Sequence, residues 1–130
     1  MQFAYPIQPA PPSTRGQLFG ANSGRHTGLD MGNGGNVILA PAGGLVQVAT
    51  LTRDSRGRMI KIDHGTDENG VTWETIYYHL ASSLVRKNDR PLPGQPIAIV
   101  GMSGLPRPWP HLHFEVRRNG VAVDPQSVLP

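Results

Sequence analysis

The chain has 130 residues, enough for one domain with a modest core; 38% of them are hydrophobic and only 16% are charged. It contains no stretch of about 20 apolar residues that could cross a bilayer. It also has no cysteine, which excludes disulfides and thiolate chemistry. The net charge of +3 is mild and there is no run of lysines and arginines, so we expect no nucleic-acid partner.

Glycine and proline, with 16 and 13 residues, together exceed a fifth of the chain and disfavour long helices. Four prolines within the first twelve residues predict an irregular N-terminal arm over residues 1–20, because proline cannot pair regularly in a sheet. This arm is either an ordered approach to the domain or a flexible linker. Residues 21–130 are predicted to form one domain.

Short strands separated by turns are predicted along this domain. Apolar or alternating runs indicate strands at residues 36–40, 45–52, 59–64, 72–79, 96–101, 114–117 and 121–123. The Asn-Gly pair within residues 67–70 is a strong hairpin signal. Residues 80–84 are predicted to form a single helical turn. The expected fold class is therefore all-β, a mostly antiparallel, sandwich- or barrel-like single domain with long loops lining a cleft.

The most informative segment is residues 110–115 (PHLHFE), which alternates as a β-strand does. Its apolar side chains face one side, and His111, His113 and Glu115 face the other. Two imidazoles two residues apart on a strand lie roughly 6–7 Å apart at Cα, close enough to share one small site. A chance pair of histidines on an exposed strand is the alternative that this segment alone leaves open.

A second segment, residues 24–30 (GRHTGLD), places His26 and Asp30 four residues apart. The surrounding glycines make a poor helix, since each costs about 1 kcal/mol relative to alanine at an interior position. We therefore expect an extended or turning backbone here. Two imidazoles and one carboxylate form a ligand set that suits catalytic zinc, in which a fourth position is left to water.

Five segments, in chain order, resemble the M23 zinc metallopeptidases (lysostaphin-type, LytM-like). They are residues 24–30 (GRHTGLD), 75–80 (TIYYHL), 94–104 (GQPIAIVGMSG), 110–116 (PHLHFEV) and 123–125 (VDP). Together they cover most of the chain, and five ordered motifs are far more specific than any one of them. Residues 107–110 (RPWP) depart from the Thr-Gly-Pro that the family often has before its His-Leu-His. That departure concerns the rim of the cleft and its substrate preference, not the metal site.

The resemblance implies that His26, Asp30 and His113 bind one zinc ion per chain. It further implies that His79 and His111 are two catalytic histidines that do not bind the metal. The implied activity is that of an endopeptidase hydrolysing peptide bonds in peptidoglycan stems or cross-bridges, by a zinc-activated water assisted by these two histidines. Which of the two is the general base, and which bond is cleaved, the sequence leaves open.

We expect a monomer whose partner is the peptidoglycan peptide, acting outside the cell or in the cell wall or periplasm. The first residues lack the basic start and apolar core of a secretory signal. Two origins are compatible with this: a domain excised from a longer secreted protein, or an antibacterial endolysin of the phage type.

Two other functions are open at this point. The first is a non-catalytic cell-wall-binding or regulatory module of the same fold, which the complete set of five residues argues against. The second is a biotinyl or lipoyl carrier domain, because residues 40–44 and 94–97 also resemble its turns. Such a carrier needs a lysine at a hairpin tip, and neither Lys61 nor Lys87 occupies a turn of that kind.

Three further residues can be interpreted either as structural or as part of the site. His64 is predicted to be structural or to line the rim. Glu115 either supports the neighbouring histidines or pairs with an arginine. Trp109, between two prolines, is the best candidate for an exposed wall of the cleft.

Overall fold

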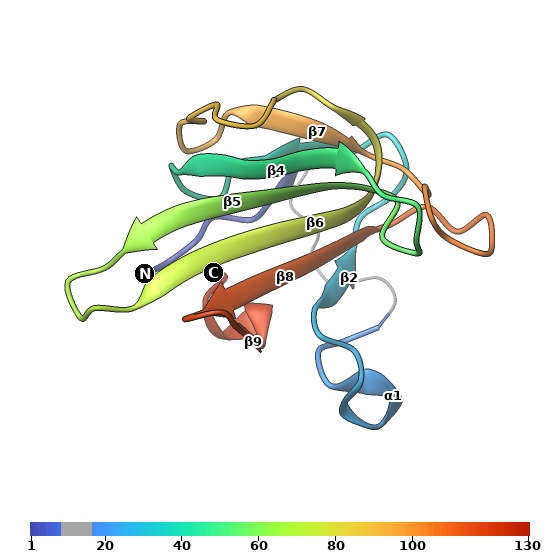
Figure 1. The fold of residues 1–130 in the computed structure, drawn as a ribbon. Helices are drawn as coiled ribbons and strands as arrows, with labels where there is room; N and C mark the ends of the chain where they lie inside the picture. Colours follow the sequence, from blue (N-terminus) through green and yellow to red (C-terminus); the bar gives the residue numbers. More distant parts are fainter. Residues whose placement is uncertain (9–16) are drawn as a thin grey trace.

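The computed structural model describes residues 1–8 and 17–130, and within them the regular secondary structure is almost entirely antiparallel β-sheet (Figure 1). All nine strands belong to one sheet. They are β1 (Ile7–Gln8), β2 (Leu29–Met31), β3 (Val37–Leu39), β4 (Leu45–Leu51), β5 (Arg58–Thr66), β6 (Thr72–Ser83), β7 (Pro96–Val100), β8 (Leu112–Arg118) and β9 (Val121–Val123). Two short helical segments complete the set, α1 (Ala21–Gly24) and η1 (Pro125–Ser127). The predicted all-β, antiparallel fold class is confirmed.

The long strand β6 organises the sheet, because it pairs with different strands along its length (Figure 1). Residues from Trp73 to Tyr78 pair with β8, whereas Leu80 to Ser83 pair with β7. The change of partner falls at His79, whose φ of 68° lies in the left-handed region. Two branches therefore leave this edge of β6, one through β7 to β3 and β1, and one through β8 to β2 and β9. Strands β5 and β4 continue the sheet from the opposite edge.

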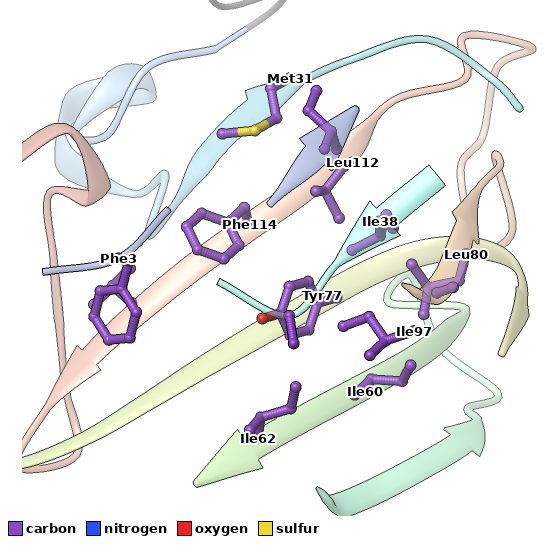
Figure 2. Packing of buried hydrophobic residues seen from close by; sticks show 14 of the residues in the cluster. Phe3, Met31, Ile38, Ile60, Ile62, Tyr77, Leu80, Ile97, Leu112 and Phe114 are labelled. Atoms are coloured by element: carbon purple, nitrogen blue, oxygen red, sulfur yellow. The ribbon is translucent and has the colours of Figure 1, made fainter. Parts of the chain in front are cut away.

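The hydrophobic core lies between these branches (Figure 2). Phe114 of β8 and Tyr77 of β6 are fully buried, with ring centroids 5.5 Å apart. Ile38 of β3 belongs to the same cluster, so the sheet curls until strands from both branches share one interior. Burial of each such side chain contributes about 1.5–3 kcal/mol, which holds β8 firmly by its apolar face.

The helical turn predicted at residues 80–84 is wrong. Residues 80–83 continue β6, and only Leu84 lies beyond its end. The pairing of Leu80 with Val100 and of Ser83 with Ala98 supplies the backbone hydrogen-bond partners that a helical turn would otherwise have provided. Pairing with a distant strand thus overrides the local pattern.

Part of the predicted N-terminal arm pairs with the sheet. Ile7 and Gln8 form β1 opposite Val37 and Ile38, and Phe3 and Ile7 are buried in the core. A proline before a short edge strand is tolerated, because it removes no ladder hydrogen bond from the two paired residues. Residues 1–8 therefore pack with the domain, whereas the remaining prolines of the predicted arm (Pro9, Pro11 and Pro12) lie outside the described residues.

The glycine-rich segment before β2 is not a regular helix, as expected. Within α1, Asn22 and Ser23 have left-handed backbone angles, and β2 begins only at Leu29. None of the helices in the described ranges has the length and apolarity that a membrane crossing requires.

Candidate metal centre

Three neighbouring strands bring Asp30, His113 and Tyr78 side by side. Asp30 of β2 pairs directly with His113 of β8, and His113 pairs directly with Tyr78 of β6. Directly paired residues place their side chains on the same face of an antiparallel sheet. The Tyr78 ring accordingly stacks on the His113 ring with centroids 5.0 Å apart. The row on the opposite face is Leu29, Phe114 and Tyr77, which belongs to the core.

His26 joins this row from the loop before β2. Its Nε2 lies 3.1 Å from Asp30 Oδ1, and His113 Nδ1 lies 3.1 Å from the same oxygen. The candidate ligand atoms of His26, Asp30 and His113 all lie within 4.8 Å of one another. The three residues that the sequence analysis assigned to zinc thus converge on one point.

The far nitrogen of each ring is already engaged by an acceptor. His26 Nδ1 donates to the Leu18 carbonyl at 2.9 Å, and His113 Nε2 donates to Glu115 Oε2 at 2.9 Å. A neutral imidazole carries one N–H, so the nitrogens that face Asp30 then carry lone pairs. Two ring nitrogens and a carboxylate oxygen turned toward one another fit a divalent cation, and this mixed donor set suits zinc.

Glu115 connects the metal-facing row to a wider network. Besides His113, its carboxylate accepts from Thr27 Oγ1 at 2.7 Å and from Arg117 at 2.7 and 3.1 Å. It therefore both contacts a histidine and pairs with an arginine, which were the two roles left open. A carboxylate behind a metal-binding histidine fixes the tautomer and the orientation of the ring.

His79 and His111 border the same space without belonging to the group of three. Each donates its Nδ1–H to a backbone carbonyl at 2.9 Å, His79 to Ser103 and His111 to Trp109. Their ring centroids lie 5.1 Å apart, and His111 Nε2 lies 3.6 Å from Asp30 Oδ2. In the neutral form of each ring, Nε2 is then the nitrogen that carries the lone pair.

The backbone at His79 explains how this side chain reaches the site. Regular alternation along β6 would place His79 on the core side with Tyr77. Its left-handed φ of 68° breaks the alternation, so Tyr78 and His79 both line the cavity and Leu80 returns to the core. Non-glycine residues with such angles are uncommon and cluster at functional sites.

Burial and neighbouring charges set the protonation of the site. Burial opposes ionisation of Asp30, but His113, His111 and His26 outweigh it and lower its pKa. Burial also opposes the charged form of His113, yet Asp30 and Glu115 raise its pKa to about 9. A cation bound beside Asp30 would take the place of the proton that His113 carries on the nitrogen facing Asp30.

The pKa values of His79 and Glu115 are lowered. Burial lowers the pKa of His79 to about 4, against the hydrogen bond to the Ser103 carbonyl. His79 is therefore neutral near pH 7. Burial alone would raise the pKa of Glu115, but hydrogen bonds from His113, Thr27 and Arg117 lower it to about 2.

The five predicted residues line one cavity of about 530 Å³. They are His26, Asp30, His79, His111 and His113. Trp109, 43% exposed, lines it too and packs against the His111 ring at 4.3 Å, as expected of a cleft wall. His64 lies elsewhere: its ring nitrogens contact the Gly43 carbonyl and the Thr75 hydroxyl, which is a structural role.

Sequence reasoning missed several residues that shape the site. Ser103 holds His79 through its carbonyl, and its hydroxyl donates to the Leu80 carbonyl at 2.7 Å. The Gly-x-Ser-Gly pattern of residues 101–104 was a usable signal, because Gly104 has a φ of 77° and a Cβ there would lie 2.6 Å from Gly57 N. Arg56 and Arg117 carry no comparable pattern, since only the fold brings them to the cavity.

Two solved peptidase structures have a fold similar to that of this chain. A zinc-containing peptidase from Vibrio cholerae is 28% identical, with a TM-score of 0.80 over all of this chain and 41% of its own. The catalytic domain of the antimicrobial peptidase lysostaphin from Staphylococcus simulans is also 28% identical. The match has a TM-score of 0.70 and covers 86% of this chain and 88% of that domain.

Among curated proteins, one relative is named an activator and not a peptidase. The murein hydrolase activator NlpD of Escherichia coli is 35% identical over 115 residues, which are 88% of this chain. The chain spans about a quarter of the length of curated relatives that it matches, 21% of one and 28% of NlpD. The model of peptidase family M23 matches residues 24–125, which is most of the sequence and includes every candidate site residue. The chain therefore belongs to peptidase family M23.

Proposed function

We propose that this chain is a zinc-dependent endopeptidase that hydrolyses peptide bonds in the stems or cross-bridges of peptidoglycan. One observation carries the proposal: His26, Asp30 and His113 converge beside two further histidines within a single cavity. Membership of a peptidase family and likeness to a zinc-containing peptidase support it. The murein-related name of a relative supports the substrate.

In this proposal His26 Nε2, Asp30 and His113 Nδ1 hold the zinc ion. Zinc so held would supply Lewis acidity that polarises the scissile carbonyl and makes water a nucleophile near neutral pH. Glu115 keeps the proton of His113 on Nε2 and so leaves Nδ1 free for the metal. Asp30 contributes the one negative charge among the three ligands.

His79 and His111 handle protons in this proposal. Each has its Nδ1–H committed to a carbonyl, so its Nε2 is free to accept a proton from water or to donate one to the leaving amine. The low pKa of His79 keeps its ring neutral and ready to accept at neutral pH. Either ring, once protonated, is also a donor for the oxyanion of the tetrahedral intermediate.

We further propose that residues 21–130 constitute the peptidase domain, that it acts as a monomer, and that it works at the cell wall or in the periplasm. Several relatives carry names of murein hydrolase activators or lipoproteins, and the structural neighbour lysostaphin is named an antimicrobial peptidase. These names favour an extracytoplasmic setting for this chain as well.

A specific observation also favours a second function. A relative that is 35% identical is called a murein hydrolase activator, so this chain would in that case stimulate a separate hydrolase instead of cleaving peptidoglycan itself. The complete set of three candidate ligands and two further histidines favours catalysis over this alternative.

Metal analysis combined with dye release from labelled cell walls separates the two functions. The purified chain should hold one zinc ion and release dye, whereas His113→Ala and Asp30→Asn should lose both properties. The first substitution removes a ligand nitrogen, and the second replaces the negatively charged carboxylate with a neutral amide, which is a poor zinc ligand. Glu68→Gln, at an exposed turn residue outside the cavity, is the matched control and should keep both. Lysis retained by His113→Ala would contradict the zinc assignment. Dye release only after addition of a separate hydrolase would favour the activator.

A further inference from the structure

The cavity has an excess of cationic side chains at its rim. Arg25, Arg56, Arg107 and Arg117 all line it. They come from the segment between α1 and β2, the turn between β4 and β5, the loop between β7 and β8, and β8 itself. The only carboxylates in the lining, among the residues that the structure describes, are Asp30 and Glu115.

Two of the four arginines are already engaged by carboxylates. Arg56 binds Asp54 with three contacts of 2.7–3.1 Å, and Arg117 binds Glu115 with two contacts of 2.7 and 3.1 Å. These pairs neutralise both members and leave the guanidinium groups oriented by the protein.

Arg25 and Arg107 differ from the other two. Both are exposed, and within residues 1–8 and 17–130 neither side chain has a hydrogen bond or ion pair. Asp30 and Glu115 cannot serve them, because Asp30 faces His26 and His113 and Glu115 is held by Thr27, His113 and Arg117. Among the described residues, the rim therefore presents two guanidinium groups that no carboxylate of the chain binds.

We propose that Arg25 and Arg107 bind carboxylates of the substrate, so that the site selects peptides carrying free carboxylates beside the cleaved bond over neutral peptides such as oligoglycine. This inference rests on the proposed function and names its substrate class. A guanidinium presents paired N–H donors that match a carboxylate, and a positive rim raises the local concentration of anionic substrate. Stem peptides with free carboxyl groups have the complementary charge, whereas an uncharged glycine bridge has none.

Three peptides and two salt concentrations test the inference on the zinc-loaded chain. They are a cross-linked stem peptide with free carboxylates, the same peptide with those groups converted to carboxamides, and pentaglycine with an acetylated N-terminus and an amidated C-terminus. We expect kcat/KM for the free-carboxylate peptide to exceed that for its amidated twin about three- to tenfold at low salt, since exposed ion pairs are individually weak. The ratio should shrink between about 0.02 M and about 0.5 M salt, because screening shortens the reach of the rim charges.

Variants assign the preference to the two arginines. Arg25→Gln and Arg107→Gln should each move the ratio between the two peptides toward one. Arg53→Gln, which removes an exposed arginine that does not line the cavity, should leave the ratio unchanged. An equal kcat/KM for free and amidated peptides, or a ratio that survives both substitutions, would overturn the inference while leaving the peptidase proposal intact.

Failure of the proposed function would look different, because none of the three peptides would then be cleaved. Calorimetric binding of the same free and amidated peptides to the zinc-loaded chain decides the inference in that case. Tighter binding of the free-carboxylate peptide, lost in Arg107→Gln, would support it. Equal binding, or no binding of either peptide, would overturn it.

Discussion

The two segments that carry the candidate histidine ligands are built in opposite ways. β8 is paired on both sides, with β2 and β6, and its apolar face is anchored in the core. His113 therefore has its position set by two ladders of backbone hydrogen bonds. His26 lies between α1 and β2, where its ring is held by the Leu18 carbonyl and by Asp30. A ligand held by few contacts depends on whatever fastens its loop to the rigid strand.

Two contacts provide that fastening. Gly28 packs so closely on β8 that a Cβ there would lie 2.5 Å from the Phe114 carbonyl oxygen and 2.9 Å from the His113 ring. Thr27 donates from the same loop to Glu115 of β8. We call these contacts of Thr27 and Gly28 with β8 the joint between loop and strand. The comparison indicates that the metal site is most sensitive there, so substitutions at the joint should weaken zinc binding.

The largest effect is expected for Gly28→Ala. The added methyl group must push the loop away from β8 or displace His113, because its closest neighbour is backbone. We expect a loss of about 1–3 kcal/mol in the free energy of unfolding, as for overpacked sites. Zinc affinity should fall about a hundredfold, at the upper end of the effects of positioning groups. Denaturant titration and competition with a zinc chelator measure the two quantities.

Gly43→Ala is the matched control. A Cβ at Gly43 would meet its nearest neighbour, Pro93, only at 3.6 Å, an ordinary contact distance. Stability and zinc affinity should both stay close to those of the parent chain. Full zinc affinity in Gly28→Ala would show that His26 reaches the metal without the loop packing on β8.

Glu115→Gln tests the side of the joint that β8 provides, and its effect on zinc affinity should be intermediate. Glutamine keeps nearly the same shape and an acceptor oxygen, but it removes the charge that orients His113 and pairs with Arg117. We expect zinc affinity to fall on the order of tenfold, with the protein still folded. Chelator competition measures the affinity, and circular dichroism reports the fold.

Glu68→Gln makes the same chemical change at an exposed turn and should leave zinc affinity unaltered. If Glu115→Gln bound zinc as tightly as the parent chain, the carboxylate would serve only Arg117 and Thr27. The strand would then position His113 by backbone pairing alone.

The part of the site on and beside β8 was easier to predict from the sequence than the loop that carries His26. Alternation alone separates His111 and His113 from Leu112 and Phe114, and the structure keeps that division. The helical turn predicted at residues 80–84 failed because the partner of that segment, β7, is distant in sequence. β1 and β2 were not predicted as strands, because β1 lies in the proline-rich segment and β2 follows a glycine-rich loop.

The site was predictable in its residue types but not in its geometry. Spacing of histidine and aspartate indicates metal chemistry, yet it does not say which nitrogen of each ring faces the metal. That depends on the Leu18 carbonyl and on Glu115, which is 89 residues from His26 in the chain. The left-handed backbone of His79, which turns it into the cavity, has no signature in a non-glycine residue.

The smallest effect is expected for Thr27→Val, which removes one hydrogen bond from the joint and leaves its packing. Thr27 Oγ1 lies 2.7 Å from Glu115 Oε2, but that carboxylate keeps His113 and Arg117 as partners and the threonine itself is exposed. We expect a cost of about 0.5–1.5 kcal/mol, the usual net value of one hydrogen bond, appearing as a two- to tenfold loss of zinc affinity.

Thr50→Val, at an exposed strand residue outside the cavity, controls for the change of side chain and should leave zinc affinity as it is. Combining Thr27→Val with Glu115→Gln tests most directly whether this hydrogen bond fastens the loop, because both substitutions act on it. Their effects on zinc affinity should fall short of additive if the loop is fastened through that bond. Strict additivity would mean that Thr27 and Glu115 act on the metal site independently, and that the packing of Gly28 alone ties the loop to the strand.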